Sequence, residues 1–180
     1  GSGRTALAIS AGSAHTCAVL DNSAVKCWGY NNNGQLGQGS TSNLGDGSGE
    51  MGDNLTAIDL GSGRTALAIS AGSAHTCAVL DNSAVKCWGY NNNGQLGQGS
   101  TSNLGDGSGE MGDNLTAIDL GSGRTALAIS AGSAHTCALL DNSAFKCWGQ
   151  NDNGQLGQGS TSNLGDGSGE MGDNLTAIDL

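Results

Sequence analysis

The stretch that decides the fold is residues 15–29, HTCAVLDNSAVKCWG. It contains two short apolar runs, His15–Leu20 and Ala24–Trp28. The polar residues Asp21-Asn22-Ser23 stand between them, and such residues favour tight turns. The pattern predicts two antiparallel strands joined as a hairpin.

Two further strands are predicted on either side of this hairpin, at Thr5–Ala11 and Thr56–Leu60. Four short strands in one unit are typical of a propeller blade. A long stretch, residues 30–55, separates the last two strands and is dense in Gly, Asn and Ser. Spaced apolar residues predict that this stretch is a packed loop rather than a disordered one: Leu36, Leu44 and Met51.

The whole unit is repeated. Residues 1–60 recur unchanged at 61–120, and recur at 121–180 with four replacements. The replacements place Leu139, Phe145, Gln150 and Asp152 where the first repeat has Val19, Val25, Tyr30 and Asn32. The sequence therefore predicts an all-β chain of tandem four-stranded, propeller-blade-like repeats, at 1–60, 61–120 and 121–180. These would form part of a β-propeller or an open repeat array; neither end resembles a cap, so we expect further repeats.

The charge balance excludes some partners. The chain has 16 Asp and Glu against 6 Lys and Arg, a formal net charge of −10. Nucleic acid is not expected as a partner, because its phosphates require clustered Lys and Arg. Membrane insertion is not expected either, because every apolar run is far shorter than the roughly 20 residues that a spanning helix needs.

A set of residues in fixed order resembles the repeat of the regulator of chromosome condensation family. The resemblance covers each repeat up to about Gly39 and implies a β-propeller, usually of seven blades. The segment Ser40–Asn54 is longer and more acidic than that family's connection, and each repeat adds two cysteines. The residues that carry the resemblance are Ile9–Gly12, His15-Thr16, Ala18–Leu20, Trp28-Gly29, Asn31, Gly34–Gly37 and Gly39.

The cysteines lie symmetrically about Asn22, so the hairpin places Cys17 directly opposite Cys27, within reach of a disulfide. Disulfides would place the protein outside the cell or on its surface. The alternatives are free thiols, or a zinc site made by His15, Cys17 and Cys27, which lacks a fourth ligand. The predicted disulfides are Cys17–Cys27, Cys77–Cys87 and Cys137–Cys147.

The acidic glycine-rich loop is a candidate Ca²⁺ site, because hard cations take carboxylate and backbone oxygens. The alternative is a solvated turn whose Asp side chains cap the backbone. The candidate ligands are Asp46, Glu50 and Asp53, with Asp106, Glu110, Asp113, Asp166, Glu170 and Asp173 in the later repeats.

The tripeptide Asn54-Leu55-Thr56 is an acceptor pattern for N-glycosylation, and it recurs at Asn114 and Asn174. An extracellular location would make glycosylation at these three asparagines possible. We therefore predict a glycoprotein modified at the end of each acidic loop.

No catalytic set of residues is found, and near-identical repeats present one surface several times rather than one asymmetric active site. We therefore predict that the protein is not an enzyme. The leading hypothesis is an extracellular structural protein that self-associates, or joins further repeats, into a fibre or surface layer. The alternative is a closed β-propeller that binds a protein or glycan through its loops; an engineered symmetric propeller is a third possibility.

Overall fold

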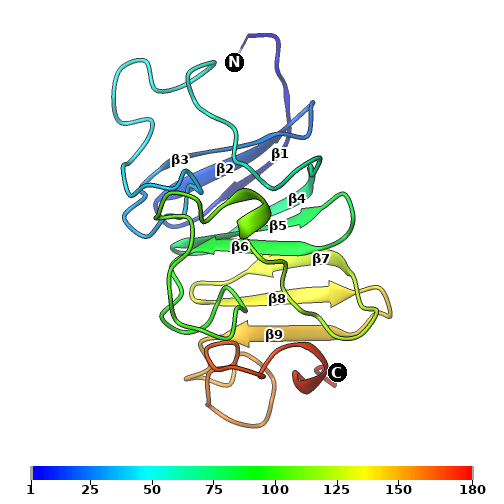
Figure 1. The fold of residues 1–180 in the computed structure, drawn as a ribbon. Helices are drawn as coiled ribbons and strands as arrows, with labels where there is room; N and C mark the ends of the chain where they lie inside the picture. Colours follow the sequence, from blue (N-terminus) through cyan, green and yellow to red (C-terminus); the bar gives the residue numbers. More distant parts are fainter. Residues whose placement is uncertain (1, 180) are drawn as a thin grey trace.

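The computed structural model describes residues 2–179, which form three successive three-stranded antiparallel sheets (Figure 1). Their helical content is limited to two single turns, η1 (Gly112–Asn114) and η2 (Gly172–Asn174), and neither could cross a membrane. The strands are β1 (Ala6–Ala11), β2 (His15–Leu20), β3 (Val25–Gly29), β4 (Ala66–Ala71), β5 (His75–Leu80), β6 (Val85–Gly89), β7 (Ala126–Ala131), β8 (His135–Leu140) and β9 (Phe145–Gly149).

The predicted hairpin is confirmed in every repeat. In the first, β2 pairs with β3 so that Cys17 lies opposite Cys27 and Val19 opposite Val25. The turn is closed by a hydrogen bond from the Ser23 amide to the Leu20 carbonyl, 2.8 Å long. Strand β1 completes the sheet beside β2, so that the order within each repeat is the order along the chain.

The prediction of four strands per repeat is wrong by one, because the Thr56–Leu60 segment does not form a ladder. In the first repeat it makes one backbone hydrogen bond to β3, from the Ile58 amide to the Val25 carbonyl, 2.8 Å long. The other end of β3 is occupied by Leu44, which bridges Gly29. Two short segments thus share the outer edge of a five-residue strand, and neither has room to extend into a fourth strand.

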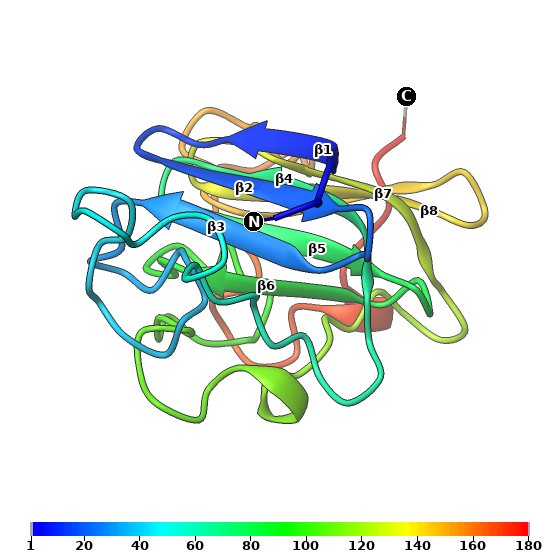
Figure 2. The ribbon, with the colours of Figure 1, turned by 90° about the horizontal axis from the view of Figure 1, so that it is seen from above.

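The three sheets stack with repeat 1 at one end and repeat 3 at the other (Figures 1 and 2). The first strand of each sheet makes the main contacts between neighbouring sheets, since β4 packs against both β1 and β2. The turns that follow these strands converge, with the Ser13 hydroxyl 2.9 Å from that of Ser73, and the Ser73 amide bonded to the Ser133 carbonyl. The sheets therefore fan around an axis near β1, β4 and β7, as blades of a propeller do.

The core lies between the repeats rather than inside any of them. We call the face of each sheet that meets the following repeat its leading face, and the opposite face its trailing face. At the first junction the leading face contributes Cys17, Val19, Val25, Cys27, Leu36, Ile58 and Leu60. The trailing face of repeat 2 contributes Ala66, Ala78, Leu80, Trp88 and Leu115. The second junction uses the equivalent residues of repeats 2 and 3.

The long loop is packed, as predicted, and Asn31 organises it. The side chain of Asn31 is fully buried. Its amide nitrogen donates hydrogen bonds to the carbonyls of Ser40 and Ser42, at 2.8 and 2.9 Å, and its oxygen accepts one from the Leu36 amide. One buried side chain therefore holds three separate points of the loop, and the same arrangement recurs at Asn91 and Asn151.

Candidate functional site

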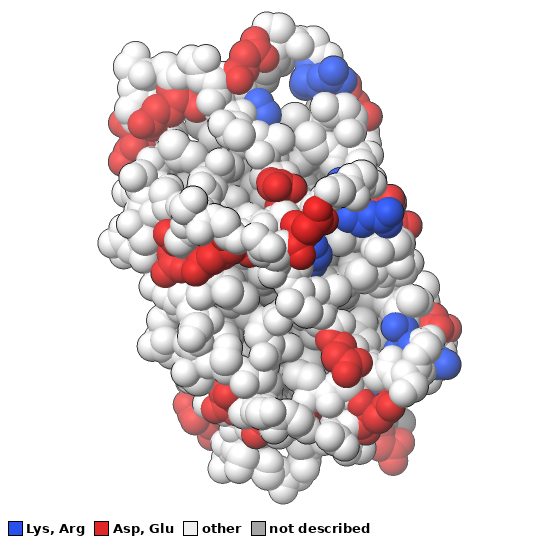
Figure 3. Space-filling view, in the orientation of Figure 1, with Lys and Arg blue, Asp and Glu red and all other residues white. Residues whose placement is uncertain are grey.

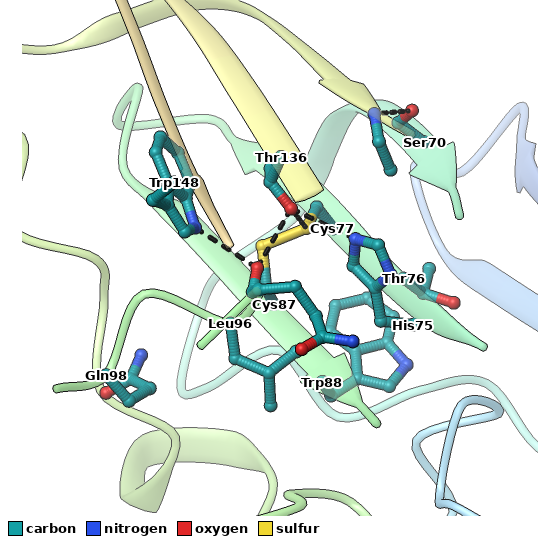
Figure 4. Close-up of a disulfide and its surroundings, with 12 residues drawn as sticks. Ser70, His75, Thr76, Cys77, Cys87, Trp88, Leu96, Gln98, Thr136 and Trp148 are labelled. Carbon is teal, nitrogen blue, oxygen red and sulfur yellow. Dashed lines mark hydrogen bonds between the residues drawn. A yellow bond between two sulfur atoms is a disulfide. The ribbon is translucent and has the colours of Figure 1, made fainter. Parts of the chain in front are cut away.

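The two junctions share one polar network that joins each blade to the next. At the second junction, His75 Nε2 lies 3.0 Å from the Thr136 hydroxyl, which donates to the Gln95 carbonyl at 2.9 Å. The same carbonyl accepts a hydrogen bond from Trp148 Nε1, 3.1 Å away (Figure 4). The first junction repeats this network with His15, Thr76, Gln35 and Trp88. Every polar group in it comes from a motif that the sequence repeats.

The network fixes the protonation state of the junction histidines. The single hydroxyl proton of Thr136 goes to Gln95, so Nε2 of His75 must be the donor to Thr136. Nδ1 then carries no proton, and among the described residues no group bonds it. Burial lowers the pKa of His75 to about 3 and that of His15 to about 4. Protonation would create a buried charge with an unpaired N–H, so both histidines are neutral.

Mild acid is expected to destabilise the protein through these two histidines. Unfolded histidine has a pKa near 6.5, so between pH 6.5 and about 4 the unfolded chain binds more protons than the folded one. Stability is therefore complete above pH 6.5 and falls as the pH is lowered, by roughly 1.4 kcal/mol per pH unit for each histidine. Urea denaturation at pH 7.0, 6.0 and 5.0 measures this slope.

The variant His75→Gln should lose a large part of the pH dependence. The comparison variant is His135→Gln: His135 occupies the same position in repeat 3 and is only partly buried, and burial lowers its pKa as well, so this variant should lose a smaller part. A free energy of unfolding that stays constant from pH 7 to pH 5 would contradict the assignment of neutral histidines.

A second set of polar contacts joins the repeats at their outer edge. Lys86 is buried, and its ammonium donates to the carbonyls of Leu60 and Gly112, at 3.0 and 2.8 Å. Burial lowers the pKa of Lys86. The Asp113 carboxylate accepts hydrogen bonds from the Ser62 hydroxyl and amide, which lower its pKa. Lys86 and Asp113 therefore both hold the segment that connects repeat 1 to repeat 2.

The structure contains the three disulfides predicted from the hairpin: Cys17–Cys27, Cys77–Cys87 and Cys137–Cys147. The paired Cα atoms are 4.1, 4.1 and 4.0 Å apart. Each disulfide joins neighbouring strands of one blade and lies on the leading face; at the second junction Thr136 packs over the Cys77 sulfur (Figure 4). The alternative of a zinc site required these sulfurs as free thiolate ligands, and the structure pairs them in disulfides instead. Three disulfides indicate that the protein folds in an oxidising environment.

The predicted metal-binding carboxylates come close to one another only in pairs, such as Asp106 with Glu110. Within residues 2–179, no three His, Cys, Asp or Glu side chains are placed to hold one metal ion. Instead, Glu50 accepts hydrogen bonds from the Gly47 and Gly45 amides, which lower its pKa, and Asp53 binds Ser2. The loop is therefore closed by its own backbone, as in the capped-turn alternative, and Ca²⁺ binding stays a prediction.

The later copies of the loop have the same closure. Glu110 accepts from the Gly105 and Gly107 amides at 2.9 and 2.7 Å, and Glu170 does the same in repeat 3. Burial, together with the neighbouring Glu110, raises the pKa of Asp106. The same glutamate-closed acidic turn thus recurs once per blade.

The predicted glycosylation acceptors lie on the surface. Asn54, Asn114 and Asn174 are exposed, and each side-chain nitrogen donates to a loop carbonyl, that of Gly49, Gly109 or Gly169. Glycosylation would use one of the two hydrogens of this nitrogen and leave one to donate. Glycosylation of these three residues stays a prediction.

One pocket recurs at each junction beside the acidic loop. The first has a volume of about 260 Å³ and the second about 280 Å³. The first is formed where Gly37–Gly39 and Thr56–Asp59 of repeat 1 meet Ser108–Met111 of repeat 2. It is open to solvent and its lining is mixed polar and apolar, with no pair of groups suited to acid–base or nucleophilic chemistry. The arrangement suits contact with a partner more than catalysis.

Blades that fan around one axis and share a repeated junction define a propeller-type repeat protein. Residues 7–35, 67–95 and 127–155 match the family model of the Regulator of chromosome condensation (RCC1) repeat. The chain is therefore built from regulator of chromosome condensation repeats, in agreement with the resemblance seen in the sequence.

Three known proteins illustrate the similarity. The Ultraviolet-B receptor UVR8 of Arabidopsis thaliana is 31% identical over 161 residues, covering 88% of this chain and 32% of UVR8. Human WBSCR16 superposes with a TM-score of 0.70 at 18% identity, covering 98% of this chain and 40% of WBSCR16. Prp20p from Saccharomyces cerevisiae gives 0.68 at 18% identity, covering 97% of this chain and 38% of Prp20p.

This chain spans about a third of UVR8 and well under half of the two solved structures. Prp20p itself binds Gsp1p and histones. The comparisons therefore favour the propeller alternative, and nothing in them supports the hypothesis of a self-associating extracellular fibre.

Proposed function

We propose that these repeats are part of a β-propeller that binds a protein partner, with the acidic loops forming the contact surface. The observation that carries this proposal is the recurrence of one rigid acidic turn at the same place in each blade. The turns at residues 45–50, 105–110 and 165–170 are each closed by a glutamate that bonds two backbone amides. A repeated rigid surface suits binding, because little entropy is lost when it meets a partner.

The partner is expected to be basic at the surface that meets these loops. Figure 3 shows Asp and Glu side chains on all three repeats of this face, whereas Lys and Arg are few and lie mainly toward one edge. The described basic residues are largely engaged within the protein. Arg4, Arg64 and Arg124 each lie 3.3 Å from an aspartate, and Lys86 and Lys146 bond backbone carbonyls. The acidic loops therefore keep an excess of negative charge.

The binding is proposed to take place outside the cell or at its surface. The disulfides support this location, because thiols in the cytosol are kept reduced. Exposed glycosylation acceptors in every repeat are consistent with it. The protein partner could itself carry glycans, but the charge of the loops favours a basic polypeptide.

The proposal is tested by removing one loop carboxylate from each blade. The immobilised chain is used to capture proteins from extracellular fluid, and a captured protein is then purified and its affinity measured by calorimetry. The triple variant Asp46→Asn, Asp106→Asn, Asp166→Asn should bind at least about tenfold more weakly, and wild-type binding should weaken as salt is raised.

The matched control removes the same charge from the opposite ends of the strands. It is Asp21→Asn, Asp81→Asn, Asp141→Asn, at the β2–β3 turn and its counterparts, and it should keep the wild-type affinity. Equal affinities for the loop variant and the wild type would contradict the proposed surface, and so would the absence of any captured protein at micromolar concentration.

A further inference from the structure

The leading face of repeat 3 is exposed, and it differs from the leading faces of repeats 1 and 2. Val25 and Val85 are fully buried at the two junctions, whereas Phe145, at the equivalent position, is 37% exposed. A groove of about 340 Å³ lies beside it. Its lining is almost entirely apolar and comes from β7, β8 and the start of β9: Ala128, Ile129, Ser130, Cys137, Ala138, Leu139 and Phe145.

This groove lies where the first strand of a following blade would pack. At the second junction the first strand of repeat 3, β7, packs against β5, and at the first junction β4 packs against β2. Strand β8, which lines the groove, is the counterpart of β5 and β2 in repeat 3. The shape of the exposed face therefore matches a strand of the same kind of blade.

The polar groups that hold a following blade are all kept in repeat 3. Ser10 and Ser70 each accept a hydrogen bond, 2.9 Å long, from an amide in the first strand of the next repeat. Their counterpart Ser130 lines the groove. The histidine and glutamine that bind the Thr and Trp of the next repeat are also retained, as His135 and Gln155. The face can therefore form the same polar contacts as the other two.

The apolar side chains of the leading face of repeat 3 differ from those of repeats 1 and 2. Of the four replacements in repeat 3, two fall on the leading face: Val19 becomes Leu139 and Val25 becomes Phe145. All trailing-face residues are unchanged among the repeats; repeat 1 presents Ala18, Leu20 and Trp28, as the later repeats do. A larger leading face therefore has no matching change in any trailing face of this chain.

Copies of this chain do not fit the enlarged face. Val79 and Val85 are 2% and 0% exposed in a cluster that includes Leu140 and Trp148 of the following repeat. Closely packed interiors do not accept added atoms without displacing neighbours. A leucine and a phenylalanine in place of these two valines would therefore collide with a trailing face of the present sequence.

We propose that Leu139 and Phe145 determine which blade follows repeat 3, and that this blade is not a copy of the three described here. It belongs to the same repeat class and supplies the threonine, the tryptophan and the strand amide that the polar groups require. It carries a smaller apolar side chain at the position of Leu140. This inference rests on blade-to-blade packing and is independent of the proposed protein-binding loops.

The test introduces the two larger side chains into the leading face of repeat 2. There, the trailing face of repeat 3 must pack against them. In the intact chain, Val79→Leu with Val85→Phe should lower the thermal midpoint by about 5–15 °C. The matched control is the reverse change at the exposed face, Leu139→Val with Phe145→Val, which should shift the midpoint by no more than about 2 °C. Repeat 3 shows that a single blade tolerates the larger pair, so the loss would arise at the junction.

A further substitution, Leu140→Ala, tests whether a smaller trailing-face side chain accommodates the enlarged leading face. Leu140→Ala should lower the midpoint of the wild type but raise that of the Val79→Leu, Val85→Phe variant, because it removes volume opposite the larger side chains. An unchanged midpoint for Val79→Leu, Val85→Phe would show that a copy of these repeats fits the enlarged face and would overturn the proposal. A failure of Leu140→Ala to raise the variant's midpoint would overturn it as well.

Discussion

Replacing Trp88 with alanine is expected to lower the free energy of unfolding by about 3–5 kcal/mol. The side chain of Trp88 is fully buried, and it is one of the two largest side chains in the described core. Its indole N–H also donates to the Gln35 carbonyl, which would lose one of its two partners. Urea denaturation of the wild type and of Trp88→Ala measures the difference.

The chain contains its own control for this experiment. Trp28 occupies the same position in repeat 1, in an identical sequence, but it lies on a trailing face that no other described blade covers and is only partly buried. Trp28→Ala should therefore reduce stability by about 1 kcal/mol. Equal losses for the two variants would mean that tryptophan stabilises its own sheet and not the junction.

Replacing Gly94 with alanine is expected to weaken the packing of repeat 3 against repeat 2. The backbone of Gly94 has a φ angle of +76°, and a Cβ atom there would lie 2.3 Å from the amide nitrogen of Asp166 in the next repeat. Real atoms never approach so closely, and the obstacle is backbone, which cannot rotate away. The substitution should reduce stability by about 3 kcal/mol or more and loosen repeat 3 in hydrogen exchange.

Gly154 is the matched control for Gly94. It has nearly the same φ, +75°, but a Cβ atom there would meet nothing within 4 Å. Gly154→Ala thus introduces only the backbone strain of a positive φ, about 1 kcal/mol. The difference between the two variants isolates the steric contact between blades, and similar losses for both would show that this contact is unimportant.

Much of the fold could be predicted because the information was local. The hairpin around Asn22 predicted which cysteines face each other, and the 60-residue period predicted three repeated units. The fourth strand was predicted wrongly because Thr56–Leu60 has the composition of a strand, while the partner edge of β3 is shared with Leu44. Competition for an edge is a tertiary effect that the residues of the segment do not reveal.

The junction network could not be predicted, because it joins residues about one repeat apart. Thr76 and Gln35 stand in the repeated motifs that carry the family resemblance, but the motifs do not reveal which residues of the neighbouring repeat they contact, and Lys86 lies outside them. The geometry of the acidic loop could not be predicted for a related reason. Its carboxylates are close in sequence, but Glu50 turns inward to bond its own backbone while Asp53 reaches Ser2.

The unchanged trailing faces have a consequence for folding kinetics. Because repeats 2 and 3 present the same surface, the leading face of repeat 1 can recognise either of them while the chain is collapsing. If the leading face of repeat 1 packed against repeat 3, repeat 2 would be excluded. This misfolded contact would have to dissociate before the native order of blades could form. The disulfides offer no protection, since each one closes a single hairpin. The misfolded contact is avoided when each blade docks on its predecessor before the next one is synthesised.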